Sequence, residues 1–170
     1  MKGFTEMKRS VLLVSMVLMV LIAGCGKKEK QTDFRIAAWG DMYADVLSNE
    51  QAEICGQGRD SISVKDVLID GDECIATYEF DEDNQLIKGS YLVKHPQKFP
   101  DEAYTDYAGL LAEKYGDAVD SGDFGSMHYA KYRTDRTEIT LEIANYEVNI
   151  KYEPLITIEK PEKGMGTDGL

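Results

Sequence analysis

Histidine is scarce in this chain, since only His95 and His128 occur among its 170 residues. Neither stands in a His-x-His or His-Glu-x-x-His spacing, so the sequence offers no template for a metal site. We expect both imidazoles to face solvent. The sequence also lacks Gly-x-Ser-x-Gly, Ser-x-x-Lys and a glycine-rich phosphate loop. Serine hydrolases and nucleotide-dependent enzymes therefore lose most of their support.

A hydrophobic run long enough to span a bilayer is also missing. The longest apolar stretch, Val11 to Ala23, is shorter than the roughly 20 residues that a membrane-spanning helix needs. Lys8 and Arg9 precede it, which is the layout of a signal peptide. The stretch leads into Gly24 and Cys25 through Leu-Ile-Ala, and this ending resembles the lipobox of bacterial lipoproteins. The resemblance implies cleavage between Gly24 and Cys25, a diacylglycerol on the Cys25 thiol and often an acylated amino terminus.

Basic charge is in short supply, with 19 Lys and Arg against 31 Asp and Glu. Removal of residues 1–24 leaves 16 basic and 30 acidic residues, a net charge near −14. A domain this acidic repels phosphate backbones, so we expect no nucleic-acid partner. The lysines at positions 27, 28 and 30 follow the anchor. They either face an anionic leaflet, where each is worth about 1 kcal/mol, or form a solvated linker.

Carboxylates are abundant, but no spacing marks a catalytic pair. The run Asp81 to Asn84 suggests a calcium loop, yet Leu86 occupies the position where an EF-hand requires glycine. We interpret the run as a hairpin turn, and we expect neither a cofactor nor an enzymatic activity.

Cysteine is limited to three residues, of which Cys55 and Cys74 remain once Cys25 is assigned to the lipid. Export permits a disulfide between them. The expected hairpin places Cys74 opposite Val67, whereas Cys55 precedes the far end of that strand. The alternatives are therefore a bond that folds back the segment Gly56 to Gly58, or two thiols with Cys74 in the core.

Beyond the tether at residues 25–32, periodicity predicts one domain at 33–158, followed by a flexible tail at 159–170. The domain contains the same order of elements twice, in repeats at about 33–94 and 99–153. The helices are expected at Asp41–Glu50, with Asp41 as its cap, and from Phe99–Asp101 to Tyr115; the strands are expected at Ser61–Ile69, Glu73–Phe80, Gln85–Val93, Met127–Thr134, Thr137–Ile143 and Tyr146–Tyr152. The pair Asp70-Gly71 predicts a type I′ hairpin.

The predicted fold class is therefore α+β, with two tandem α-β-β-β units, each an antiparallel meander backed by one helix. Whether the two sheets merge is left open. The stretch from Phe34 to Asp41, the hairpin around Tyr78 and Gly89, and the helix end Glu113 to Gly116 resemble small uncharacterised secreted proteins and lipoproteins of Gram-positive bacteria. That resemblance covers most of residues 33–153 and implies a shared fold, without implying a catalytic residue.

More remotely, the repeat order resembles β-lactamase-inhibitor-like proteins and small outer-membrane assembly lipoproteins of the SmpA/OmlA type. Those folds bind other proteins, although this sequence lacks the Gly-x-Pro that follows the helix in the assembly lipoproteins. Most of the tyrosines are expected to pack in the core. On the strand of weak alternation around His128, Tyr129, Tyr132 and Arg133, an exposed aromatic strip is the alternative, and no site is assigned to it.

Together these features predict a lipid-anchored protein on the extracytoplasmic face of the cell membrane. Its expected activity is binding of an envelope protein or polymer. A small-ligand-binding lipoprotein is the alternative, and an envelope enzyme that uses carboxylates is a third class.

The lipid anchor gives the first testable prediction. Mass spectrometry of the mature protein extracted from membranes should show an N-terminus that starts at lipid-modified Cys25. A chain in which Cys25 carries no lipid would contradict the assignment. A Cys25→Ser variant is the control, because it should keep residues 1–24 and lose the mass of the lipid.

Overall fold

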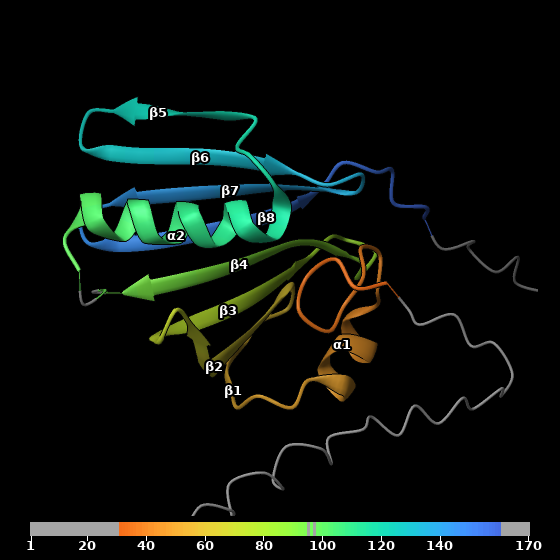
Figure 1. The fold of residues 1–170 in the computed structure, drawn as a ribbon. Helices are drawn as coiled ribbons and strands as arrows, with labels where there is room; N and C mark the ends of the chain where they lie inside the picture. The colour runs from red at the N-terminus through yellow and green to blue at the C-terminus, as the bar shows by residue number, and fades with distance from the viewer. Residues whose placement is uncertain (1–30, 95, 97, 161–170) are drawn as a thin grey trace, which may run out of the picture.

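In the computed structural model, residues 31–94, 96 and 98–160 are described (Figure 1). They form two helices, α1 (Tyr43–Asn49) and α2 (Pro100–Tyr115), and eight strands. The strands are β1 (Ile54–Gln57), β2 (Ser61–Ile69), β3 (Asp72–Phe80), β4 (Leu86–Lys94), β5 (Asp120–Phe124), β6 (Met127–Arg133), β7 (Thr137–Ala144) and β8 (Glu147–Pro154). All eight belong to a single antiparallel sheet in the order β1-β2-β3-β4-β8-β7-β6-β5.

This sheet contradicts the prediction of two tandem helix-backed units. The pairing of β4 with β8, from Gly89 opposite Tyr152 to Lys94 opposite Glu147, joins the two meanders into one sheet. Each meander alone would leave one of these strands as a free edge with unpaired backbone groups. Helix α1 does not back a meander as predicted, since it has only seven residues and buries only Val46.

The individual elements agree better with the sequence than the architecture does. The two helices and the six predicted strands lie within two residues of their expected bounds. Asp70 and Gly71 both have positive φ and connect the paired residues Ile69 and Asp72, which confirms the type I′ hairpin. Asp41 does not cap α1 as predicted, because its carboxylate accepts a hydrogen bond from the Ala38 N–H.

Strands β1 and β5 were not predicted. Both are short, lie at the two edges of the sheet and have mostly exposed side chains. Strand β5 reads Asp-Ser-Gly-Asp-Phe and thus shows no alternation of apolar and polar residues. This segment is extended because it pairs with β6, since its amino-acid composition alone does not favour a strand.

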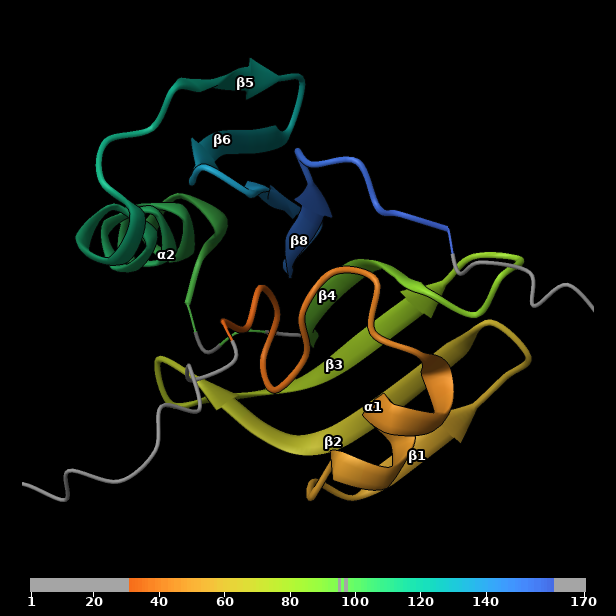
Figure 2. The same cartoon turned by 90° about the vertical axis from the view of Figure 1, so that its right-hand side faces the viewer.

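The core lies on one face of the sheet, and the opposite face is uncovered in the described part of the chain. Helix α2 packs its buried Ala103, Tyr107 and Leu111 against β6 and β7. The loop that precedes α1 covers the other half of this face, and α1 itself adds only one buried residue (Figures 1 and 2). The strand residues that fill the core are Ile62, Val64, Cys74, Ala76, Tyr78, Phe80, Leu86, Val93, Ala130, Tyr132, Ile139, Leu141, Ile143, Val148, Ile150 and Tyr152. No helix among the described residues has the length and apolarity needed to cross a membrane.

Phe34 holds the N-terminal loop against the seam between β4 and β8. Its buried ring lies directly over Gly89, so closely that a Cβ added there would come within 2.3 Å of the ring. Tyr78 and Tyr152, which pair with Gly89 on the two neighbouring strands, flank the ring at centroid distances of 5.2 Å. Only glycine leaves room for this packing.

A Gly89→Ala substitution should therefore destabilise the fold. Because the clash is with a buried aromatic ring, we expect a loss of about 1–3 kcal/mol in the free energy of unfolding, measured by urea denaturation. Gly109→Ala is the matched control. Gly109 lies on the exposed side of α2 with no atom within 4 Å of an added Cβ, so this change should be stabilising by about 0.5–1 kcal/mol. Equal effects at the two positions would contradict the packing argument.

Candidate functional site

A pocket of about 380 Å³ opens on the helix-bearing side of the sheet, over the seam between β4 and β8. It lies where the last turn of α2, the start of the described chain and the turn between β6 and β7 come together. Its volume is in the range that ligand pockets occupy, roughly 300–1,000 Å³. Its lining consists of Gln31, Thr32, Asp33, Phe34, Arg35, Tyr91, Lys114, Tyr115, Thr134, Asp135, Thr137, Ile139 and Tyr152.

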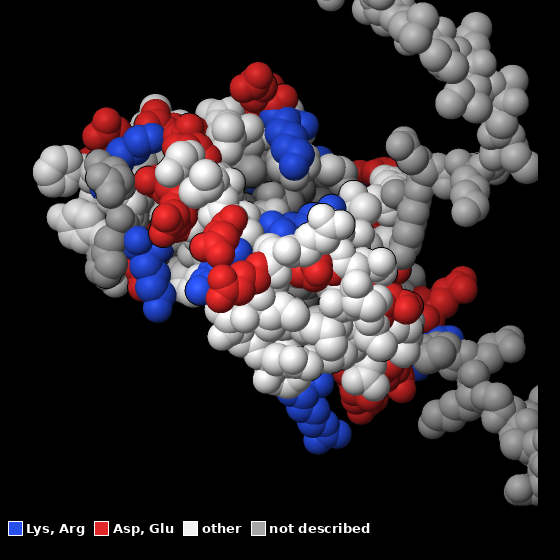
Figure 3. Space-filling view, turned by 90° about the horizontal axis from the view of Figure 1, so that it is seen from below, with Lys and Arg blue, Asp and Glu red and all other residues white. Residues whose placement is uncertain are grey.

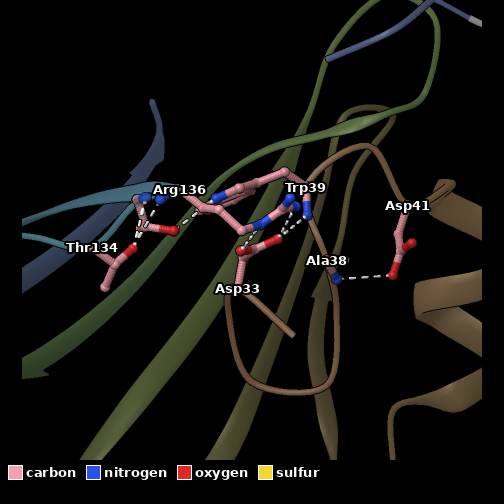
Figure 4. A network of polar contacts seen from close by, with 7 residues as sticks. Asp33, Ala38, Trp39, Asp41, Thr134 and Arg136 are labelled. Carbon is pink, nitrogen blue, oxygen red and sulfur yellow. Dashed lines mark hydrogen bonds and ion pairs between the residues drawn. The ribbon is translucent and has the colours of Figure 1, made fainter. Parts of the chain in front are cut away.

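One wall of the pocket is an ion pair between Asp33 and Arg136. The Arg136 Nε and one terminal nitrogen donate to the two carboxylate oxygens of Asp33, at 2.8 and 2.9 Å. Asp33 also accepts a hydrogen bond from the Trp39 backbone N–H, and the Trp39 indole N–H donates to the Thr137 hydroxyl (Figure 4). The Asp33 side chain is only 2% exposed, so its carboxylate is shielded from solvent. Its hydrogen bonds to Arg136 and Trp39 hold the loop on the sheet.

A second ion pair lies behind the pocket. Arg35 donates to both oxygens of Glu50, and the Tyr78 hydroxyl donates to the same carboxylate. Burial by itself would raise the pKa of Glu50, but hydrogen bonds from Tyr78, Ala52 and Arg35 outweigh it and hold that pKa below its usual value. Glu50 is thus an anion that neutralises Arg35. Arg35 has a φ of 51°, a strained backbone that this pairing helps to keep.

Three tyrosines give the pocket its hydroxyl groups. Tyr91, Tyr115 and Tyr152 come from β4, α2 and β8, respectively. Burial raises the pKa of Tyr91 to about 12, and burial together with the neighbouring Tyr115 raises the pKa of Tyr152 further. Both groups therefore stay neutral at physiological pH, able to donate and to accept hydrogen bonds.

The aromatic rings of the pocket pack at tilted angles against Phe34 and edge to face against one another. The Phe34 ring lies 5.0 Å from that of Tyr91, and the rings of Tyr91 and Tyr152 lie 5.8 Å apart. Tyr115 contacts the other side of Tyr152 at 6.3 Å, and the Lys114 ammonium lies 5.0 Å from the Tyr115 ring centre. The pocket therefore combines rigid aromatic surfaces with polar tips.

No group of metal-binding side chains is found among the described residues. His128, predicted to face solvent, is half-buried between two carboxylates, with its Nε2 2.9 Å from Asp101 and its Nδ1 2.7 Å from Asp123. His95 lies outside the described residues. The run Asp81 to Asn84 forms the predicted turn, in which the Asp81 carboxylate accepts hydrogen bonds from the N–H groups of Asp83 and Gln85.

The aromatic strip considered as the alternative on β6 does not exist as one surface. Tyr132 faces the core, is 2% exposed and donates its hydroxyl to the Ala108 carbonyl. Tyr129 and Arg133 lie on the uncovered face, where Arg133 pairs with Glu138. Alternation of sides along a strand separates residues that the sequence places together.

Gly24 and Cys25 lie outside the described residues, so the lipidation site stays a prediction. Cys55 and Cys74 are both free thiols in the structure. Cys55 is exposed on the edge strand β1, while Cys74 is buried on β3 opposite Val67, as the hairpin register predicted.

The sequence did not single out the residues of the pocket. Tyr115 and Tyr152 stand at the ends of a predicted helix and a predicted strand, and nothing in the sequence says that they meet. The only local signal was Arg35 within the Phe34–Asp41 stretch, an unusual cation among apolar residues. Its partner Glu50 lies at the far end of α1, and Arg136 lies 103 residues from Asp33.

The two thiols should differ in reactivity. Burial raises the pKa of Cys74 to about 11, and its side chain is inaccessible, whereas Cys55 is exposed. Titration of mature, lipidated protein with Ellman's reagent at pH 8, without reductant, should show one thiol that reacts at once and a second that reacts only after denaturation. Cys55→Ser should remove the fast reaction alone. Two fast thiols, or none after denaturation, would contradict this assignment.

Comparison of the chain with protein-family models, with curated proteins and with solved structures finds no match. The resemblances to Gram-positive lipoproteins and to tandem α/β repeat proteins therefore remain predictions. The geometry of the pocket and the N-terminal sequence are the features of this chain that bear on its function.

Proposed function

We propose that this protein is a lipid-anchored binding module on the extracytoplasmic face of the cell membrane, which holds a component of the envelope in the pocket beside its tether. The observation that carries the proposal is the composition of that pocket. Arg35, which lines it, and Arg136, which pairs with the lining residue Asp33, are both neutralised by carboxylates, while its tyrosines present neutral hydroxyls on a rigid aromatic base. Such a surface suits reversible binding.

The position of the pocket fits a tethered protein. Gln31 and Thr32 line it, and five residues, hence six peptide units, separate Gln31 from the proposed lipid on Cys25. Six peptide units reach at most about 22 Å, so the pocket would stay within that distance of the membrane surface. The ligand would then be a component that is available close to the bilayer.

A protein partner on the uncovered face of the sheet is the second candidate. One row across the sheet places Ile75, Leu92, Asn149, Glu142 and Tyr129 side by side on that face. Apolar side chains in such a row favour protein contact. This candidate is weaker because the same face carries ion pairs, in which opposite charges neutralise each other. Glu79 pairs with Lys88, and Lys151 pairs with Glu142 of the row itself.

Capture of envelope material distinguishes the two sites. Mature lipidated protein in detergent should retain a fraction of solubilised envelope on an affinity resin. Tyr115→Ala removes a pocket wall and should abolish retention. Tyr129→Ala removes a tyrosine from the uncovered face and should leave retention intact, with both variants checked for a native melting temperature.

The opposite result, loss with Tyr129→Ala alone, would move the function to the uncovered face. Retention that neither substitution changes would refute the pocket as the binding site. Failure of the wild-type protein to retain anything would refute the proposed function itself.

A further inference from the structure

The chemistry of the pocket narrows its ligand, and we infer that it takes a neutral sugar unit, a mono- or disaccharide segment of an envelope glycan. This inference rests on the proposed binding function and names the ligand class for the same pocket. It is argued from the charges, hydroxyls and strand pairing around the cavity.

The charges of the pocket cancel internally. Arg35 is neutralised by Glu50, and Arg136 by Asp33. The side chains that remain are Lys114 and Asp135, both exposed and of opposite sign. A phosphate or carboxylate ligand is bound tightly only by cationic side chains that are not already paired with carboxylates. Lys114 alone would give such a ligand only one ionic contact. In Figure 3, acidic and basic side chains are interspersed around a broad area of uncharged residues, and no basic patch is seen on that face.

One pair of hydroxyls in the pocket, those of Tyr115 and Tyr152, is incompletely hydrogen-bonded. Tyr115 donates to Tyr152, or accepts from it, across 3.5 Å, which is a long hydrogen bond. Whichever way this bond points, the accepting tyrosine keeps an O–H proton with no acceptor in the pair. Tyr152 is only 6% exposed, so its hydroxyl gains from a ligand that supplies hydrogen-bond partners. A purely apolar ligand such as an acyl chain would leave these groups unpaired.

A peptide is disfavoured by the topology of the sheet. Extended peptides bind by adding a strand to a free sheet edge. The strands that border the pocket are β4, β7 and β8, and each of them is paired on both sides. The backbone N–H and C=O groups of these strands are therefore already used in the sheet and cannot pair with a peptide strand.

A sugar satisfies the remaining features together. Its C–H faces pack on aromatic rings such as those of Tyr115 and Tyr91, while its hydroxyls exchange hydrogen bonds with tyrosine hydroxyls as both donors and acceptors. The Thr134 and Thr137 hydroxyls at the opposite wall already accept hydrogen bonds from N–H groups of the chain, so they offer a ligand mainly their O–H protons. Neither the sugar nor the pocket needs a net charge for these contacts.

The test titrates mature lipidated protein in detergent with N,N′-diacetylchitobiose and with cellobiose, followed by calorimetry. Glucuronic acid, inorganic phosphate and a neutral tripeptide are the comparison probes. We expect at least one neutral disaccharide to bind. Tyr115→Phe, which keeps the ring and removes the hydroxyl, should weaken its affinity about tenfold, the loss expected for one hydrogen bond.

Tyr146→Phe is the matched control, because Tyr146 is exposed in the turn between β7 and β8 and does not line the pocket. It should change the affinity for the neutral sugar by less than about twofold. Binding of glucuronic acid or phosphate that Lys114→Gln abolishes would overturn the neutral-sugar assignment, as would binding of the tripeptide alone.

The two proposals fail in different ways. If no disaccharide binds but envelope material is still retained in a Tyr115-dependent manner, the sugar assignment is wrong and the binding function stands. If neither sugar nor envelope material is bound, both are wrong. If a disaccharide binds to Tyr115→Phe and to Tyr115→Ala as tightly as to the wild-type protein, it is bound elsewhere and the pocket assignment fails.

Discussion

The pairing of β4 with β8 is the contact on which the rest of this structure depends. It turns two four-stranded meanders into one sheet and places Gly89 between Tyr78 and Tyr152. The gap left by the missing side chain of Gly89 admits the ring of Phe34, and that ring fixes the N-terminal loop over the seam. The pocket exists because this loop, α2 and the β6–β7 turn all meet above the same seam.

The loop is held by charge as well as by packing. Asp33 and Glu50 have almost no exposed surface, and each is paired with an arginine and with further hydrogen-bond donors. Burial of a charge is costly unless such partners are present, and removal of either arginine would leave an uncompensated carboxylate in the core. These pairs therefore specify one position for the loop. They also neutralise the two arginines at the pocket. The groups left to contact a ligand are therefore mainly hydroxyls and aromatic rings.

The proposed anchor and the pocket lie at the same end of the chain. The signal-peptide pattern and Cys25 predict where the protein resides, and the start of the described chain forms part of the pocket wall. Under the proposed function, a tether that begins at the binding site would restrict the ligand to what the membrane surface offers. The net negative charge of the chain disfavours binding to anionic polymers.

The sequence by itself determined the local features of this protein. Alternation in Thr137–Ala144, the turn at Asp70-Gly71 and the cap at Gly116 are set by residues close together, so the strands, the hairpin and the end of α2 were predicted correctly. Short polar strands such as β5 lack that local signal. The union of the two meanders, the ion pair of Asp33 with Arg136 across 103 residues, and the meeting of Tyr91, Tyr115 and Tyr152 were decided only by the tertiary structure. The physical reason is that these contacts depend on which edge strands pair, and periodicity reports which side of a strand is buried without naming the partner that buries it.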